Sequence, residues 1–251
     1  MESQIYSDER RCEININHRS KVLSVLICAH LCLVACLFPV TAHAQETITV
    51  AVASSLYPAM QQQAVLFEKK HDVTIRLVPG STGRLYNQIM QGAPFDLFIA
   101  ADQERPALLL RHGKSISQHD VGLGYVGLIA GRQPLAGLEQ LKSASVRHIA
   151  IANPDVAPFG RVTRELLQQQ GFWDTLKHKF VYTQNAMQAA MMVNKGLVDA
   201  GFIPVASDAP SIAIIRYQGV LLADKPMALL LLKSMAAVQG EPVVSQLTRN
   251  P

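Results

Sequence analysis

Four hydroxyl-bearing residues lie in two short elements, each placed where a strand-like segment meets a helix-like segment. They are Ser54, Ser55, Ser81 and Thr82. The first pair follows the apolar run 48–52, and the second pair follows the run 73–77. Helix N-termini present unpaired backbone N–H groups and the positive end of the helix dipole. Because hydroxyls add neutral donors at such a position, the pattern indicates a receptor for a small anion.

Each of these hydroxyls also has a simpler explanation, because Ser and Thr are preferred at helix N-caps. For the first pair, capping is the commoner role. The second pair is flanked by Gly80 and Gly83, which allow the close backbone approach that an anion-wrapping loop requires. For that pair, the residue types leave anion binding and capping equally open.

The first 44 residues have the features of an export signal. Two basic residues precede the apolar segment 22–40, and Ala42-His43-Ala44 forms a small-residue cleavage pattern. A membrane anchor is one alternative, since about 20 apolar residues span a bilayer, and lipid attachment at Cys36 is a weaker one. We therefore predict that residues 1–44 are a cleaved signal peptide and that the mature chain is periplasmic.

Composition narrows the function classes. All four cysteines lie in the leader: Cys12, Cys28, Cys32 and Cys36. A cysteine-free exported domain needs no disulfide and offers no thiolate metal site. The 251-residue chain has 23 Lys and Arg against 19 Asp and Glu, without a long basic run, so a nucleic-acid partner is not expected. The part after the leader is long enough for one large domain or two small lobes.

After the leader, strand-like and helix-like segments alternate. The expected strands are residues 48–53, 73–78, 96–101, 148–152, 180–183 and 200–204. The expected helices are residues 59–70, 85–91, 106–112, 161–170 and 187–195. This alternation predicts an α/β fold with parallel strands covered on both faces, in which ligands bind at the carboxyl ends of the strands. The glycine-rich stretch 121–131 is either a bend between lobes or a strand with a bulge.

Several sequence blocks, in this order, resemble the periplasmic molybdate-binding protein family. They are residues 48–56 (ITVAVASSL) with 59–60, residues 80–85 (GSTGRL) with 88–89 and 92–102 (GAPFDLFIAAD), and residues 152–154, 157–160 (APFG) and 171–176 (GFWDTL). The resemblance covers about residues 47–203. It implies a two-lobed type II periplasmic binding protein fold, each lobe being a mainly parallel sheet flanked by helices. Lobe one would comprise residues 45–125 and 215–251, and lobe two residues 126–214.

The resemblance also implies a function and a site. The protein would capture molybdate, and tungstate, in the interlobe cleft as a monomer, and deliver it to an ABC permease with its ATPase. No cofactor, covalent step or direct metal ligand is implied. The oxyanion would be held by the hydroxyl of Ser55, alone or with Ser54, by that of Thr82 or its neighbour Ser81, and by the backbone N–H groups of Phe159 and Ala186. Some family members add a tyrosine hydroxyl, but residues 201–205 contain no tyrosine.

Two alternative functions remain open at this stage. One is the same fold with another small anion, such as sulfate, thiosulfate, phosphonate or a carboxylate. The other is a serine-dependent hydrolase, which is disfavoured because the sequence has no Gly-x-Ser-x-Gly motif and no histidine within the serine elements.

Charged residues near the motifs have ordinary explanations. Arg84 and Arg161 resemble anion clamps, but basic side chains in a first helical turn usually point to solvent, and the resemblance implies neutral coordination. For Asp96 and Asp102, capping is the commoner role. The segments 228–232 and 241–247 are compressed relative to the family, so we expect a trimmed final helix or an altered reading frame.

Overall fold

The computed structural model describes residues 45–131 and 133–236, so the predicted signal peptide lies outside the described residues. The described strands form one nine-stranded sheet in the order β2-β1-β3-β9-β4-β8-β6-β7, with β5 paired to β4. Within the described ranges, no helix combines the length and apolar content needed to cross a bilayer.

The elements alternate along the chain, as predicted. The strands are β1 (Glu46–Ala53), β2 (Val73–Gly80), β3 (Leu97–Ala100), β4 (Ser117–Ala130), β5 (Gln133–Pro134), β6 (Ile149–Ala152), β7 (Phe180–Thr183), β8 (Ala200–Val205) and β9 (Ala213–Leu221). The helices are η1 (Ser54–Leu56), α2 (Tyr57–Glu68), α3 (Thr82–Met90), α4 (Glu104–Arg111), η2 (Leu138–Lys142), α5 (Pro158–Gln169), α6 (Trp173–Leu176), η3 (Lys177–Lys179), α7 (Ala186–Asn194) and α8 (Pro226–Ala236).

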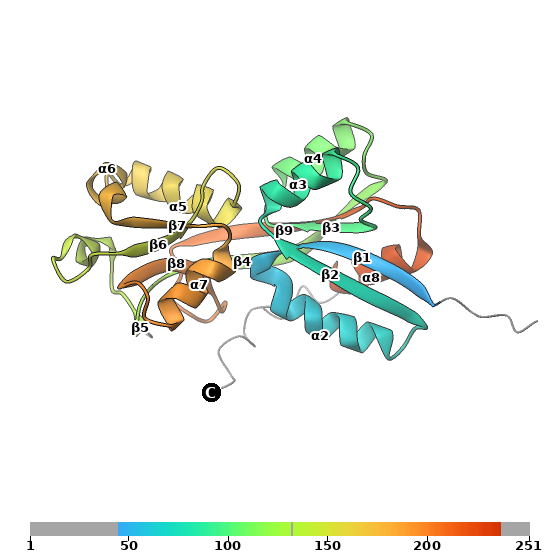
Figure 1. Cartoon of the computed structure of the whole chain (residues 1–251), viewed down its shortest axis with the longest axis horizontal. Helices are drawn as coiled ribbons and strands as arrows, with labels where there is room; N and C mark the ends of the chain where they lie inside the picture. Colours follow the sequence, from blue (N-terminus) through green and yellow to red (C-terminus); the bar gives the residue numbers. More distant parts are fainter. Residues whose placement is uncertain (1–44, 132, 237–251) are drawn as a thin grey trace, which may run out of the picture. The chain divides into compact units, whose positions relative to one another are not determined.

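The strands β2, β1 and β3 form a parallel group that we call the first half-sheet. Alternate β1 side chains face opposite ways, as the two-residue period of a strand requires. Val50 and Val52 belong to the cluster that contains Met60 of α2. Ala51 belongs to the cluster that contains Leu85 of α3. Helices therefore cover both faces, with α2 on one side and α3 and α4 on the other (Figure 1).

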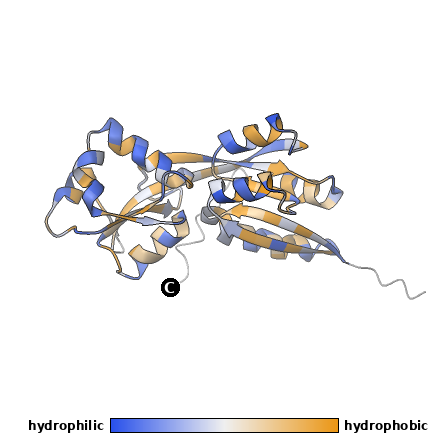
Figure 2. Cartoon of the chain, turned by 45° about the horizontal axis from the view of Figure 1, so that its top comes forward, coloured by the Kyte–Doolittle hydropathy of each residue, from blue (hydrophilic) through white to orange (hydrophobic). Residues whose placement is uncertain are grey.

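The strands β7, β6 and β8 form a second parallel group, the second half-sheet. Ala150 of β6 packs with Ala189 of α7, whereas Ile149 belongs to the same cluster as Leu167 of α5. The helices thus lie on opposite faces here too. Figure 2 shows hydrophobic residues concentrated on the strands and hydrophilic residues on the outward sides of the helices.

Two long antiparallel strands, β4 and β9, run between the half-sheets: β9 pairs with β3, and β4 pairs with β8. The register of β4 shifts between Asp120 and Gly122, where Gly122 has φ +149°. The bulged-strand interpretation of the glycine-rich stretch is therefore confirmed. The two predicted boundaries between the lobes follow residues 125 and 214. These residues face each other in the sheet, since Tyr125 of β4 pairs with Ile214 of β9.

The last described helix, α8, contacts β4 and β9 and buries Leu231 and Leu232. It contains the segment 228–232 that appeared compressed in the sequence. Segment 241–247 lies outside the described residues. The helix-flanked, mainly parallel half-sheets agree with the predicted α/β architecture.

Candidate functional site

The two hydroxyl-bearing elements lie next to each other at one edge of the first half-sheet. Strands β1 and β2 are parallel, and their last residues, Ala53 and Gly80, are partners in the register. Ser54 and Ser81 follow these residues directly, so both pairs of hydroxyls project from the carboxyl ends of adjacent strands. This is the edge at which α/β sheets bind ligands.

All six predicted site residues line a single small cavity, which we call the serine cavity and which has an empty volume of about 200 Å³ that includes space open to solvent. Its lining residues are Ala53, Ser54, Ser55, Gly80, Ser81, Thr82, Ala101, Ala157, Pro158, Phe159, Asn185 and Ala186. None of these residues carries a charged side chain. The structure therefore brings together hydroxyls from the first half-sheet and helix N-termini from the second, in neutral surroundings.

The serine hydroxyls do not cap the adjoining helices. Ser81 is the N-cap residue of α3, but its side chain makes no capping hydrogen bond. Ser54 and Ser55 lie inside η1, and neither η1 nor α2 has a side-chain cap. The capping explanation is therefore wrong for these three residues, and their burial needs another explanation.

Ser81 has the most informative hydroxyl. Its Oγ atom is buried and has no hydrogen-bond partner among the described residues, and the residue is only 4% exposed. An unpaired buried polar group costs about 1–3 kcal/mol. Because this atom belongs to a residue that lines the cavity, it marks a position where a ligand acceptor would complete the hydrogen bonding.

Thr82 has a different environment from its neighbour. Its Oγ1 atom accepts a buried hydrogen bond of 3.1 Å from the backbone N–H of Ala101, just beyond β3. This bond ties the start of α3 to the end of β3. The structure therefore separates the two adjacent hydroxyls into one with a protein partner and one without.

Ser55 has a partner that the sequence reasoning missed. The hydroxyl of Tyr217, on β9, donates a buried hydrogen bond of 2.9 Å to Ser55 Oγ. Burial raises the pKa of the Tyr217 phenol. The alternating burial of β9 is a signal for a strand, but the contact joins residues 162 positions apart and depends on long-range register.

The second half-sheet contributes two helix N-termini. Phe159 is the second residue of α5, after Pro158, and Ala186 is the first residue of α7. Amides in a first helical turn have no intrahelical acceptor, and the helix dipole favours negative charge there. Asn185, which sequence reasoning also missed, is the N-cap of α7, and its Oδ1 accepts the Gln188 N–H at 3.0 Å.

The two arginines near the motifs do not line the cavity. Arg84 donates to Gln184 Oε1 at 2.9 Å. Arg161 pairs with Asp102 at 3.0 Å and also with Glu104. The hydrogen bond and charge of Arg161 hold the pKa of Glu104 below its usual range. Arg84 is exposed, as expected, whereas Arg161 is only partly exposed. Each also has a partner in the other half-sheet.

The two aspartates have structural roles. Asp102 Oδ1 accepts the Arg105 N–H at 3.1 Å, at the start of α4, which agrees with the expected capping role. Asp96 instead accepts the Thr49 N–H of β1 at 2.8 Å and pairs with Lys225 at 3.0 Å. Capping is therefore the wrong role for Asp96, which ties β1 to the chain segments beside it.

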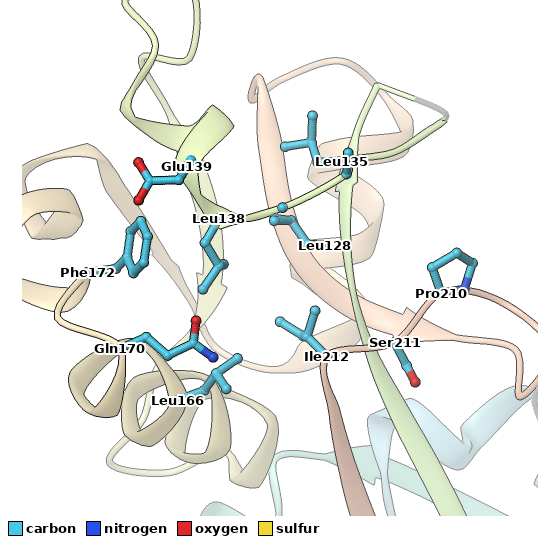
Figure 3. Close-up of a pocket in the computed structure, with 12 residues that line it drawn as sticks. Leu128, Leu135, Leu138, Glu139, Leu166, Gln170, Phe172, Pro210, Ser211 and Ile212 are labelled. Carbon is cyan, nitrogen blue, oxygen red and sulfur yellow. The ribbon is translucent and has the colours of Figure 1, made fainter.

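A larger cavity, with an empty volume of about 1180 Å³ by the same measure, has unsuitable chemistry for an anion (Figure 3). Its lining is rich in leucine and isoleucine side chains and includes the carboxylate of Glu139, which would repel an oxyanion. It shares no lining residue with the serine cavity. In the described part of the chain, no group of three or more His, Cys, Asp or Glu residues is placed to hold a metal ion.

Sequence comparisons identify related proteins. Residues 48–233 match the family of bacterial extracellular solute-binding proteins. A molybdate-binding protein of Rhodobacter capsulatus is 31% identical over 165 residues, which are 64% of this chain and 65% of that protein. A molybdate-binding protein of Azotobacter vinelandii is 32% identical over 160 residues, covering 62% and 64% of the two chains. The matched region thus spans slightly less than two thirds of these relatives.

Solved structures agree with this family. The periplasmic molybdate-binding protein of Azotobacter vinelandii superposes with a TM-score of 0.68 at 26% identity, over 75% of this chain and 92% of the other. The fold is shared with the sulfate-binding protein SubI of Mycobacterium tuberculosis, which is 12% identical. The two superpose with a TM-score of 0.62 over 77% of this chain and 82% of the SubI chain. Because the family match covers most of the sequence, the chain belongs to the bacterial extracellular solute-binding proteins, a family of binding proteins rather than enzymes.

Proposed function

We propose that this protein reversibly captures molybdate, and also tungstate, in the serine cavity. The observation that carries the proposal is the buried, unpartnered Oγ of Ser81, in a cavity without charged side chains. Proteins named for molybdate binding are about 30% identical to this chain, and the match to the solute-binding family, over residues 48–233, includes both serine elements. A neutral donor set suits a dianion whose charge is spread over several oxygens.

The donors come from both half-sheets. Ser54, Ser55 and Ser81 supply hydroxyls, and Phe159 and Ala186 supply backbone N–H groups. Thr82 holds its loop to β3 through the bond to Ala101, so Ser81 rather than Thr82 provides the main hydroxyl of that pair. None of the lining residues has a side chain that titrates near neutral pH. This supports reversible binding of a ligand rather than its hydrolysis.

We further propose that the cavity is an interlobe cleft in a closed state. Lobe one would comprise residues 45–125 and 215–251, and lobe two residues 126–214. In support, the Gly83 N–H donates to Val156 O at 2.9 Å, and the Arg84 and Arg161 contacts also join the two half-sheets. A ligand that contacts both lobes favours the closed population.

We propose that the protein is a monomer and that its closed form is delivered to an ABC permease and its ATPase. Closure gives the permease a surface that reports the presence of ligand. The predicted periplasmic location fits this role, and it fits the match to an extracellular family.

Calorimetric titration of residues 45–251 with molybdate, tungstate, sulfate and phosphate tests the proposal. We expect molybdate and tungstate to bind much more tightly than the other two anions. Tight binding of sulfate or phosphate alone would support the other-anion alternative. Binding of none of the four would contradict oxyanion capture altogether.

A further inference from the structure

Ser55 and Tyr217 form a buried pair on the protein side of the serine cavity. Ser55 is 3% exposed and lines the cavity, whereas Tyr217 is 1% exposed and is absent from the lining. The Tyr217 hydroxyl donates to Ser55 Oγ at 2.9 Å. Tyr217 therefore lies behind a residue of the binding site and acts on a ligand only through that residue.

The direction of this hydrogen bond limits what Ser55 can do. A serine hydroxyl has one hydrogen and two lone pairs. Tyr217 occupies one lone pair, so the hydrogen of Ser55 must point away from the tyrosine. An accepted hydrogen bond also polarises the hydroxyl and strengthens it as a donor. Both effects favour donation from Ser55 to an acceptor in the cavity.

On this basis we propose that Tyr217 is a positioning residue that orients the Ser55 hydroxyl as a donor toward the bound oxyanion. The inference rests on the proposed function. Burial raises the pKa of the phenol, so Tyr217 keeps its proton and its donor role at neutral and moderately alkaline pH.

The surroundings of Tyr217 fix its ring in place. A Cβ atom at Gly124 would lie 2.6 Å from Cε2 of Tyr217 and 2.7 Å from its hydroxyl oxygen. Because real Cβ atoms do not approach so closely, any larger residue at position 124 would displace the ring. Gly124 on β4 thus provides the space in which the tyrosine hydroxyl reaches Ser55.

A double-mutant cycle with molybdate binding as the readout tests the inference. Tyr217→Phe keeps the ring but removes the donor, and we expect it to weaken molybdate affinity about tenfold, equivalent to about 1.4 kcal/mol. In a Ser55→Ala background the same change should have almost no further effect. A merely structural role of Tyr217 would weaken binding in both backgrounds.

A second variant displaces the Tyr217 hydroxyl in a different way, and a control variant makes the same Tyr-to-Phe change at an exposed position. Gly124→Ala should displace the tyrosine hydroxyl, and it should weaken binding only when Ser55 is present. Tyr182→Phe is the matched control, because Tyr182 is 52% exposed, and it should leave affinity unchanged. Melting curves of each ligand-free variant establish that it is folded before titration.

The outcomes separate the two proposals. If the unmodified protein binds molybdate but Tyr217→Phe binds equally well, or loses the same affinity with and without Ser55, the positioning role is overturned while the proposed function stands. If the unmodified protein binds no oxyanion, the proposed function fails, and the inference about Tyr217 fails with it.

Discussion

Ser81 and Thr82 are adjacent, yet their side chains have different hydrogen-bond surroundings. Thr82 Oγ1 accepts the Ala101 N–H, whereas Ser81 Oγ has no partner in the described part of the chain. The family resemblance alone left either hydroxyl as the anion ligand. Thr82 has a structural partner, whereas Ser81 is the proposed anion ligand, so the two residues should respond differently to substitution.

Ser81→Ala should weaken molybdate binding by about 1.5–3 kcal/mol, the value of a hydrogen bond to a charged group. The ligand-free protein should be as stable as before, or slightly more stable, because an unpartnered buried hydroxyl is removed. Calorimetry and chemical denaturation measure the two effects. Unchanged affinity would exclude Ser81 as a ligand.

Thr82→Val is the complementary variant, because it keeps the side-chain shape but leaves the buried Ala101 N–H without an acceptor. We expect the free energy of unfolding to fall by about 1–3 kcal/mol. Its loss of molybdate affinity should be smaller than that of Ser81→Ala. The reverse order would assign the binding role to Thr82.

At the scale of elements, two glycines in first helical turns make close contacts of different kinds. A Cβ on Gly83 of α3 would lie 2.8 Å from Val156 O, in the other half-sheet. A Cβ on Gly160 of α5 would lie 1.9 Å from Ala152 O, at the end of β6 in its own half-sheet. The first contact limits how the halves meet, and the second limits how a helix packs on its own strand.

Gly83→Ala should therefore oppose closure without preventing folding. We expect it to weaken molybdate binding by about 1–3 kcal/mol, since it overpacks a tight contact and disturbs the bond to Val156. The melting temperature of the ligand-free protein should change little. Unchanged affinity would contradict the proposal that the Gly83 contact belongs to the ligand-bound closed state.

Gly160→Ala is the paired variant, and it should instead lower stability. Because the clash is with backbone inside one half-sheet, we expect the free energy of unfolding to fall by about 3 kcal/mol or more. Denaturation of the ligand-free protein measures this loss. Wild-type stability would show that α5 can shift away from β6 at little cost.

Asp199 joins the start of β8 to the start of β6. Its carboxylate accepts the backbone N–H groups of Arg147 at 2.8 Å and His148 at 2.7 Å, and these bonds hold its pKa below the usual range. Such a group contributes stability above its unfolded pKa of about 3.9. The contribution is lost as the pH falls through the lower folded-state value.

Asp199→Asn should consequently reduce the free energy of unfolding by about 1 kcal/mol at pH 7. The difference from wild type should shrink as the pH is lowered below about 4, as denaturation curves across this range would reveal. Asp174→Asn, at an exposed position paired with Lys177, is the control and should have little effect. A pH-independent difference at Asp199 would contradict the assigned cause.

The elements also show what sequence alone can predict. The parallel strands and their helices were predicted within a few residues, because their apolar periodicity is local. Strand β9 was not predicted, since its antiparallel pairing with β3 and β4 joins distant segments. The serine elements are predictable because their motifs are local. The hydrogen bond from Tyr217 to Ser55 is not, because it joins residues far apart in the sequence.

At the scale of the whole described molecule, polar contacts between the half-sheets occur near the serine cavity. Residues that flank the site motifs make them: Arg84 bonds Gln184, and Arg161 pairs with Asp102 and Glu104. The carboxylates of Asp102 and Glu104 thus neutralise the charge of Arg161, Arg84 bonds a neutral amide, and the cavity itself keeps neutral donors. This arrangement fits an anion receptor in which ligand contacts and rim contacts form together.

Anomalous diffraction at the molybdenum absorption edge most directly tests whether molybdate binds in the serine cavity. Crystals of residues 45–251 grown with molybdate should show one strong anomalous peak in the serine cavity, with the oxygens of that molybdate within hydrogen-bonding reach of Ser55, Ser81 and the amide of Phe159. A peak in the larger cavity beside Glu139, or no ordered peak in crystals of protein saturated with molybdate, would contradict the account.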